Sequence, residues 1–291
     1  MFAFVIHTAI IFTIFLMLAV GCNFIVGYGG LFTIGHGAFY ALGAYAAGLL
    51  STKLGLGFWP GLAAGGVVAA AVGGALAISL STVDEDYFSL ATFGFGIVTF
   101  TVLMNWFSVT NGALGIAGIP APTLFGLEIE SGVPYLALVV VAAVLCYGGV
   151  WLLIRSPFGR VLQAMRDEAA GVAACGRNVV WLKSVCFAIG SFIAGVAGVL
   201  YAHYATYIDP TSFTVEVSIL SLSMAVVGGL GTLAGPLLGA VVVVLAPELL
   251  RFVDLPAGSA GLIRQGIYGG LLVLTLAIRP AGLLGRRTRG G

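Results

Sequence analysis

Side chains that could perform acid, base or nucleophilic chemistry are few in this sequence, and their spacing matches no catalytic pattern. The sequence contains no HExxH, GxSxG or GxxxxGK[ST] pattern, so a metalloprotease, a serine hydrolase and a P-loop ATPase are not indicated. The four cysteines, Cys22, Cys146, Cys175 and Cys186, form no CxxC pair and are interpreted as small buried hydrophobic residues. The chain is therefore predicted not to be an enzyme and to bind no metal or cofactor. Any ATP that drives it must be hydrolysed by another chain.

A glycine-rich run over residues 27–40 is the pattern that points most directly to a binding path. It places Thr33 and His36 among glycines. A glycine break frees backbone groups inside a membrane, which is tolerated only where protein or a water-filled cavity covers them. Two interpretations stay open: a broken helix that lines a path, or a tight cytoplasmic turn between the first two membrane segments.

The candidate path residues are polar side chains inside or beside predicted membrane segments. They are Asn23, Thr33, His36, Asn105 and Asn111. Helix bundles also use such residues structurally, so His36 could be a hydrogen-bonded structural residue, and Asn23 and Asn105 could be donors between helices. All 11 acidic residues fall in predicted loops or at segment ends, which argues against a proton- or sodium-coupled carrier.

Residues 155–183 form the longest polar connection and combine basic residues with a helical pattern. Ser156-Pro157 is typical of a helix start, and Gly176 suits a helix C-cap. Between them, apolar residues recur at helical spacing: Val161, Leu162, Met165, Ala169 and Val172. One or two amphipathic helices are therefore predicted, either lying on anionic lipid or inserting into a partner protein. The alanine-rich faces and the Glu168-Ala169-Ala170 sequence favour insertion.

The composition of the chain predicts the elements that must position these residues. Of 291 residues, 60% are hydrophobic and only 8% are charged, against about 25% in a soluble domain. Mean hydropathy is +1.13. This excludes a cytosolic or secreted globular protein and a disordered chain, and the net charge of +1 gives no support for nucleic-acid binding. The remaining class is a polytopic membrane protein.

The predicted fold is an all-α transmembrane bundle of about nine segments, formed by a single domain over residues 1–291. Residues 1–52 supply two segments divided near residues 27–30, with no signal-peptide pattern. Residues 217–250 contain several glycines and a proline in mid-run and are predicted to form a broken pair of short helices. The other predicted segments are 59–81, 87–106, 133–154, 184–204 and 262–279.

The basic residues predict the orientation. Residues 155–183 and the tail, with Arg279, Arg286, Arg287 and Arg289, hold nine of the 12 Lys and Arg residues, so both are predicted to be cytoplasmic. An even number of segments must then separate them, which supports the broken pair. Counting back places Met1, Lys53 and residues 107–132 outside, and the acidic run 84–86 inside.

Several of these stretches together resemble a known family. The 155–183 connection resembles the EAA-type coupling segment of ABC-importer permeases. The chain from about residue 24 to 285 resembles the branched-chain amino-acid permease family, LivM type. The stretches that carry the resemblance are 30–45, 86–96, 155–178 and 207–250, together with the Arg-Pro-Ala-Gly-Leu-Leu-Gly ending at 279–285.

The resemblance implies a multi-subunit importer in the bacterial inner membrane, with the C-terminus cytoplasmic. A sister permease would complete the pore, two cytosolic ATPases would bind ATP and Mg²⁺, and an extracytoplasmic binding protein would deliver the substrate. The resemblance also implies an ATPase contact on the coupling segment. The residues assigned to that contact are Arg160, Arg166, Asp167, Glu168, Ala169 and Gly176.

Three alternatives stay open from the sequence. The first concerns the substrate: some relatives of this family carry urea, amides or other small polar solutes. The substrate therefore stays undecided between these solutes and branched-chain amino acids. A channel or secondary carrier that works alone is the second alternative. The third is an assembly or anchoring subunit that transports nothing.

Overall fold

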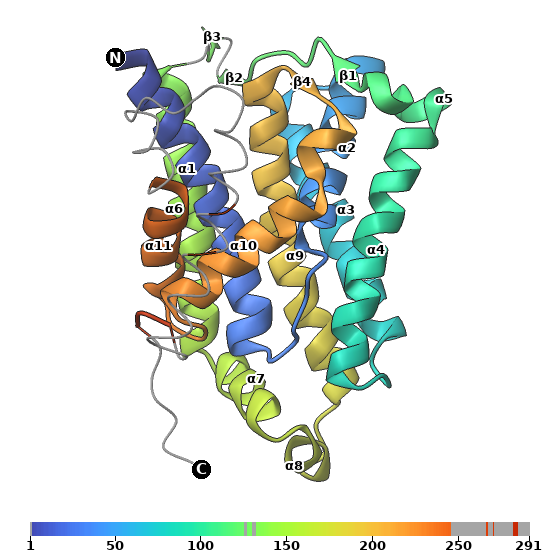
Figure 1. Ribbon diagram of the computed structural model, residues 1–291, viewed down its shortest axis with the longest axis vertical. Coiled ribbons are helices and arrows are strands. Elements are labelled where there is room, and N and C mark those ends of the chain that lie inside the picture. Colours follow the sequence, from blue (N-terminus) through green and yellow to red (C-terminus); the bar gives the residue numbers. More distant parts are fainter. Residues whose placement is uncertain are drawn as a thin grey trace.

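The apolar runs of the sequence form long helices that stand side by side in the computed structural model (Figure 1). The structure describes residues 2–124, 127–129, 132–245, 266, 270 and 282–284. Within them, six helical stretches are long and apolar enough to cross a membrane. The chain is therefore a multi-pass helical membrane protein, as predicted. The helices in these stretches are α1 (Phe2–Asn23), α3 (Phe58–Ser79), α4 (Glu85–Asn105), α6 (Val133–Arg155), α9 (Val179–Ala205) and α10 (Val215–Gly228).

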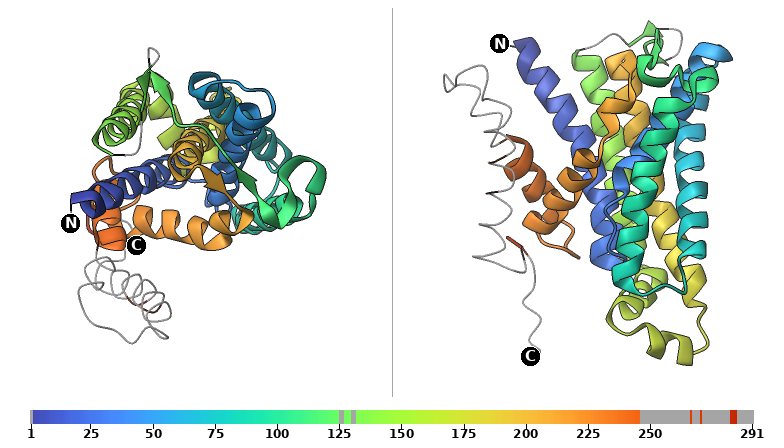
Figure 2. Two further views of the ribbon diagram at one scale, coloured as in Figure 1. Left: turned by 90° about the horizontal axis from the view of Figure 1, so that it is seen from above. Right: turned by 45° about the vertical axis from the view of Figure 1, so that its right-hand side comes forward.

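Helix α2 (His36–Lys53) lies inside the bundle, although its sequence is too polar to be one of these six. Twelve of its 18 residues are buried, His36, Tyr40 and Tyr45 among them. It packs against α3 and α9, while α9 also contacts α1. Seen from above, α1 and α6 lie on one side of α9, and α2, α3 and α4 on the other (Figure 2). Protein rather than lipid therefore surrounds the polar groups of α2, as a membrane requires.

Glycine allows the closest of these contacts. A Cβ atom on Gly43 of α2 would lie 2.2 Å from the carbonyl oxygen of Gly195 in α9. One on Gly198 of α9 would lie 2.0 Å from the carbonyl oxygen of Tyr40. Helix association in lipid depends on such close packing, because no hydrophobic driving force remains between helices. The high glycine content therefore supports the core of the bundle.

The first two membrane segments are not joined by a tight turn. Helix α1 continues into the π-helix η1 (Phe24–Tyr28), and α2 begins only at His36. The intervening chain includes Leu31, Thr33 and Gly35, all buried. Gly35 approaches α4 so closely that a Cβ atom would lie 2.1 Å from the Thr92 carbonyl oxygen. The amides of residues 32–35 therefore return into the bundle without helical hydrogen bonds, which favours the broken-helix interpretation.

The predicted break in residues 217–250 is confirmed. Helix α10 ends at Gly228, and α11 (Gly235–Ala240) continues into the π-helix η4 (Val241–Leu245). Gly229 and Gly231 both have positive φ angles, 115° and 69°, which glycine adopts readily. The end of this predicted pair beyond residue 245 and the predicted segment 262–279 lie outside the described residues, so nine segments stay a prediction.

The two ends of the bundle differ in structure. One end, which we name the strand end, carries α5 (Phe107–Thr110) and two short antiparallel pairs (Figure 1). Lys53 donates there to the Ser108 and Val109 carbonyl oxygens, at 3.2 and 3.0 Å. The pairs are β1 (Ile116–Ala117) with β4 (Tyr207–Ile208) and β2 (Thr123–Leu124) with β3 (Leu127–Glu128), and two 3₁₀ turns, η2 (Gly112–Leu114) and η3 (Pro210–Phe213), lie near them in sequence.

The opposite end, which we name the coupling end, carries α7 (Pro157–Asp167) and α8 (Ala169–Ala174) below the long helices (Figure 1). Helix α9 begins five residues earlier than predicted, at Val179, because the Asn178 side chain accepts the Trp181 amide and caps it. Lys183 therefore lies within the helix. A charge marks the edge of the apolar segment but does not end a helix.

Candidate functional site

The sequence between α6 and α9 folds into two short helices, and local signals set their limits. The Ser156 hydroxyl accepts the Gly159 amide at 3.3 Å, and Pro157 occupies the first helical turn. Glu168 then takes an extended conformation (φ −156°, ψ 91°) that separates α7 from α8. Gly176 follows α8 at φ +75°, the left-handed conformation typical of a helix C-terminus. The predicted helix start and C-cap are therefore confirmed, and there are two helices rather than one.

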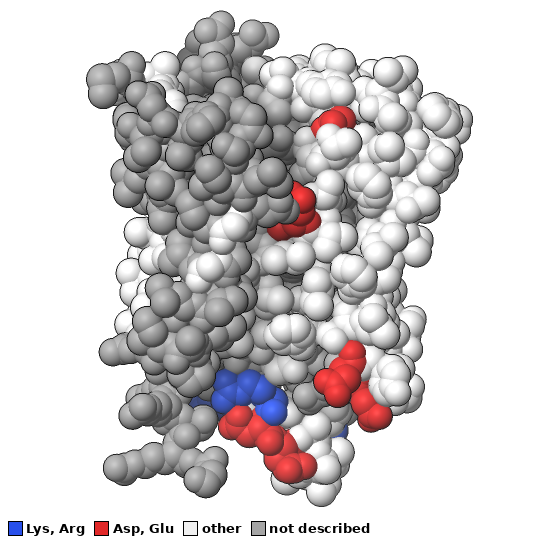
Figure 3. Space-filling view, in the orientation of Figure 1, with Lys and Arg blue, Asp and Glu red and all other residues white. Residues whose placement is uncertain are grey.

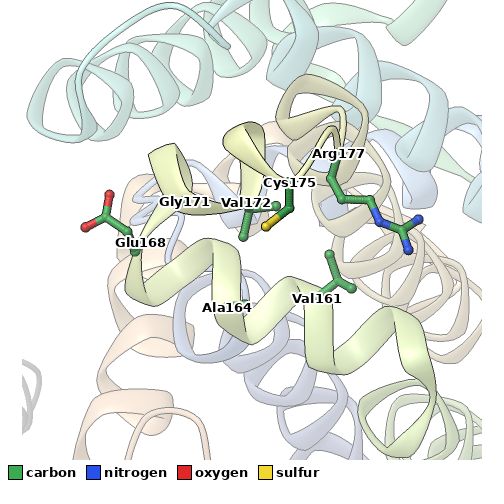
Figure 4. A pocket seen from close by; sticks show the side chains of 7 residues that line it. All are labelled: Val161, Ala164, Glu168, Gly171, Val172, Cys175 and Arg177. Atoms are coloured by element: carbon green, nitrogen blue, oxygen red, sulfur yellow. The ribbon is translucent and has the colours of Figure 1, made fainter.

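The two helices enclose an apolar hollow of about 400 Å³. Val161 and Ala164 of α7 face Val172 and Cys175 of the α8 region across it (Figure 4). Glu168, Gly171 and Arg177 complete the lining. Leu162 and Met165 lie on the other side of α7, where they are buried against the bundle. One face of α7 thus anchors the segment, and the other leaves an open apolar hollow with a carboxylate and a guanidinium among its lining residues.

Charged side chains gather at this end. On the face shown in Figure 3, basic atoms and most acidic atoms lie at the lower end, below a largely uncharged middle. Arg160, Asp167 and Glu168 are exposed. Ala169 begins α8 and is partly buried. The residues predicted to contact an ATPase are therefore brought together on one short segment outside the bundle.

Arg166 is a charged residue of this segment whose side chain binds the broken helix of the bundle. Its Nη1 donates to the Gly27 carbonyl oxygen at 2.8 Å, in the last turn of η1. Its Nε and Nη2 donate to Asp167 Oδ1 at 2.9 and 2.7 Å. The guanidinium is thus held between a carboxylate on its own segment and a backbone oxygen of the broken helix.

The Asn23 side chain makes two hydrogen bonds to the backbone of another segment. Its Oδ1 accepts the Gly231 amide at 3.0 Å, and its Nδ2 donates to the Thr232 carbonyl oxygen at 2.9 Å. The amide therefore connects the end of α1 to the loop between α10 and α11. The structural interpretation of Asn23 is favoured, although it joins a helix to a loop rather than to another helix.

Thr33 and His36 lie inside the bundle and are completely buried. The Thr33 hydroxyl accepts the Gly35 amide at 3.3 Å. The His36 ring lies within reach of the Leu18 backbone of α1, and its Nε2 is 3.1 Å from where a Gly21 Cβ atom would lie. Among the described residues neither ring nitrogen makes a well-formed hydrogen bond, so His36 stays a candidate path residue.

Asn105 and Asn111 lie far from Thr33 and His36, towards the strand end. Asn105 is exposed and donates to Thr101 of its own helix at 2.8 Å, so it connects no second helix. Asn111 has a φ angle of 59° and donates to the Gly115 carbonyl oxygen at 3.2 Å. The five candidate path residues are therefore not brought together into one site.

Glu216 is a candidate path residue that the sequence reasoning missed. The nearby Ser218 hydroxyl accepts the Gly37 amide at 2.8 Å, so α10 begins beside the first turn of α2. Lys53 marks the other end of α2, about 24 Å away at 1.5 Å per residue. Glu216 is thus an exposed carboxylate within the length of the bundle rather than at a membrane boundary. Carboxylates at such depths often mark transport paths.

The cysteines are free, and one of them contradicts the prediction. Cys22 and Cys186 are buried and Cys146 is half-buried, but Cys175 is exposed. Its sequence neighbours are small and apolar, yet it follows α8, which stands outside the bundle. Among the residues the structure describes, no group of three or more His, Cys, Asp or Glu residues could hold a metal ion.

Sequence comparisons agree with this architecture. The family model described as "Branched-chain amino acid transport system / permease component" matches residues 4–276. The chain is 35% identical over 294 residues to the high-affinity branched-chain amino acid transport system permease protein LivM of Salmonella typhimurium. That alignment covers 93% of this chain and 68% of the relative.

More distant relatives extend the same pattern. The probable branched-chain amino acid transport permease protein LivM of Methanocaldococcus jannaschii is 29% identical over 73% of this chain and 64% of its own length. The permease protein LivH of Escherichia coli, from a high-affinity branched-chain amino acid transport system, is 26% identical over 63% of this chain and 60% of its own length. No solved structure matches the chain.

Proposed function

Because the chain belongs to the branched-chain amino acid transport permease family, we propose that it is the permease subunit of an ATP-driven importer for branched-chain or related amino acids. The observation that carries this proposal is the family match over residues 4–276 together with a helical segment that projects from one end of the bundle. The membrane-length helices supply the path, and other chains supply ATP hydrolysis. The chain itself is then not an enzyme.

The α7–α8 segment is proposed to receive an ATPase subunit. Its hollow is apolar, with Glu168 and Arg177 in its lining, and its inner face is buried against the bundle. A projecting apolar side chain of the ATPase would fill the hollow. Closure of two ATPases around their nucleotides would then push on a segment that is already attached to the bundle.

The remaining partners follow from the family. A sister permease would complete the pore, as the LivM and LivH names of the relatives suggest. An extracytoplasmic binding protein would deliver the substrate at the strand end. The membrane is proposed to be the bacterial inner membrane, with the coupling end and the C-terminus in the cytoplasm.

Filling the hollow tests the ATPase contact. In Ala164→Trp the indole ring would occupy space that the ATPase needs, so we expect the ATPase to be lost when the complex is purified through the permease. Ser79→Trp is the matched control, because Ser79 is exposed at the same end of the bundle but outside α7 and α8. Retention of the ATPase by Ala164→Trp, at the level of Ser79→Trp, would contradict the proposed contact.

Reconstitution tests the function as a whole. With the sister permease, ATPases and binding protein in liposomes, we expect ATP-dependent uptake of leucine, isoleucine or valine. Uptake of urea or an amide in their place would change the substrate but keep the function. Uptake by this chain alone, without ATP, would show a channel or carrier and contradict the proposal.

A further inference from the structure

We propose that Arg166 is the positioning residue that transmits movement of α7 to two broken segments of the bundle, residues 27–35 and 229–234. The inference rests on the proposed function, since it assumes that an ATPase moves α7. It adds the route by which that movement would reach the membrane interior.

Arg166 touches both broken segments at once. Its Nη1 donates to the Gly27 carbonyl oxygen at 2.8 Å. Its Cγ lies 2.7 Å from the position of a Cβ atom on Gly30, and its Nη1 lies 3.1 Å from the position of one on Gly231. The two glycines lack side chains where the arginine passes, so this single residue of α7 packs against residues 27–30 and against the α10–α11 loop.

The two segments are also joined to each other at this point. A Cβ atom on Gly27 would lie 2.2 Å from the Gly231 amide nitrogen. The Asn23 side chain hydrogen-bonds the Gly231 amide and the Thr232 carbonyl oxygen. A displacement of Gly27 therefore cannot leave Gly231 behind without breaking these contacts, and both segments move as one unit.

The geometry suits a push rather than a simple helix cap. Asp167 fixes the guanidinium through two donors, Nε and Nη2, which leaves Nη1 pointed at Gly27. A planar guanidinium can donate to Asp167 and to the Gly27 carbonyl oxygen at the same time, because its N–H groups have fixed directions. A lysine ammonium lacks this fixed geometry. Arg166 also lies two residues before Glu168, where α7 ends and the apolar hollow begins. Force applied at the hollow would reach the arginine through one turn of helix.

Distances between spin labels in the assembled transporter test the route. One pair joins Ala173→Cys to Ser79→Cys and reports movement of α8, because Ala173 is exposed and does not line the hollow. The second pair joins Ala234→Cys to Ser79→Cys and reports the α10–α11 loop. Cys175→Ser and Cys146→Ala remove the exposed and half-buried thiols in both cases, and Ser79 and Ala234 are exposed. We expect both distances to change when a nucleotide is trapped in the ATPases.

In Arg166→Met we expect the Ala173 distance still to change and the Ala234 distance to stay constant. Arg155→Met is the control, because the Arg155 guanidinium lies over the Trp151 ring of its own helix, 4.2 Å from the ring centroid, and both distances should still change. Uptake per ATP hydrolysed should fall about tenfold or more in Arg166→Met, the scale set by one hydrogen bond to a charged group. Arg155→Met should keep the original ratio.

The inference would be overturned if the Ala234 distance changed as much in Arg166→Met as in the labelled protein that keeps Arg166. The proposed function would then remain intact. No change of the Ala173 distance in the labelled protein that keeps Arg166 would overturn both. If Arg166→Met fails to assemble, Asp167→Asn serves in its place. It keeps the arginine but loosens its orientation, so a reduced change at Ala234 supports the route, and an unreduced change overturns it.

Discussion

At the residue scale, polar side chains inside this bundle bind the backbone of other segments. Asn23 holds the Gly231–Thr232 loop, the Ser218 hydroxyl accepts the Gly37 amide, and the Tyr135 hydroxyl donates to the Leu200 carbonyl oxygen at 2.5 Å. Backbone groups freed by broken helices need such partners, because the membrane offers no water to replace them. Several other buried polar side chains make no such bond: among the described residues, the His36 ring nitrogens and the hydroxyls of Tyr45 and Ser191 are examples.

Asn23→Ala should destabilise the protein without touching a transport path. It removes two hydrogen bonds and leaves the Gly231 amide and Thr232 carbonyl unsatisfied, at a cost of about 1–3 kcal/mol in the free energy of unfolding. The measurement is the thermal midpoint of the purified protein in detergent. Asn105→Ala is the matched control, because it breaks only a bond within its own exposed helix turn. Equal midpoints for the two variants would mean that the Asn23 contact does not stabilise the fold.

At the scale of elements, glycine positions determine how closely α2, α3 and α9 approach. A Cβ atom added to Gly65 of α3 would lie 2.8 Å from the Gly43 carbonyl oxygen of α2. A Cβ atom added to Gly195 of α9 would lie 2.7 Å from the Gly65 carbonyl oxygen. The three helices thus meet backbone to backbone around the least apolar of them, α2. This contact is what keeps His36 and the tyrosines of α2 away from lipid.

Gly43→Ala should separate α2 from α9. The new methyl group would lie 2.2 Å from a backbone oxygen, which no side-chain rotation relieves, so we expect a loss of at least about 1–3 kcal/mol. Gly148→Ala on α6 is the control, since nothing lies within 4 Å of its Cβ position, and helix propensity alone should stabilise it slightly. The yield of monodisperse protein and its thermal midpoint compare the two. A Gly43→Ala protein as stable as the Gly148→Ala protein would contradict the packing.

The positions of most of these helices are predictable from the sequence, and the features that are not predictable have physical causes. Hydropathy predicts α3, α4 and α6 within a few residues, because each must match the thickness of a membrane. The glycines and the proline of residues 217–250 predict the break between α10 and α11. The partners of the breaks are tertiary, so nothing near Gly231 in sequence reveals Asn23 or Arg166. The coupling segment was predictable from Ser156, Gly176 and the apolar spacing, whereas its hollow depends on the angle at Glu168.

At the scale of the whole molecule, charge separates the two ends. Of the six Lys and Arg residues in the described part of the chain, Arg155, Arg160, Arg166, Arg177 and Lys183 belong to the coupling end, and Lys53 lies at the strand end. The acidic run 84–86 also starts α4 at the coupling end, and Lys183 shares a small hollow with Val83 there. The fold therefore brings Lys183 to the residue that precedes the acidic run, from about 100 positions away in sequence.

This asymmetry leads to a prediction about orientation in the cell. Cytoplasmic loops are enriched in Lys and Arg, so the coupling end should face the cytosol. Cys175 is exposed there, whereas Cys22 and Cys186 are buried, so a membrane-impermeant maleimide should label Cys175 in inverted vesicles and not in intact cells. Leu54→Cys in a Cys175→Ser background is the matched control, because Leu54 is 66% exposed and follows Lys53 at the strand end; it should be labelled in intact cells. Labelling of Cys175 from outside would place α7 and α8 beyond the reach of any cytosolic ATPase, and the proposed coupling would then have no source of energy.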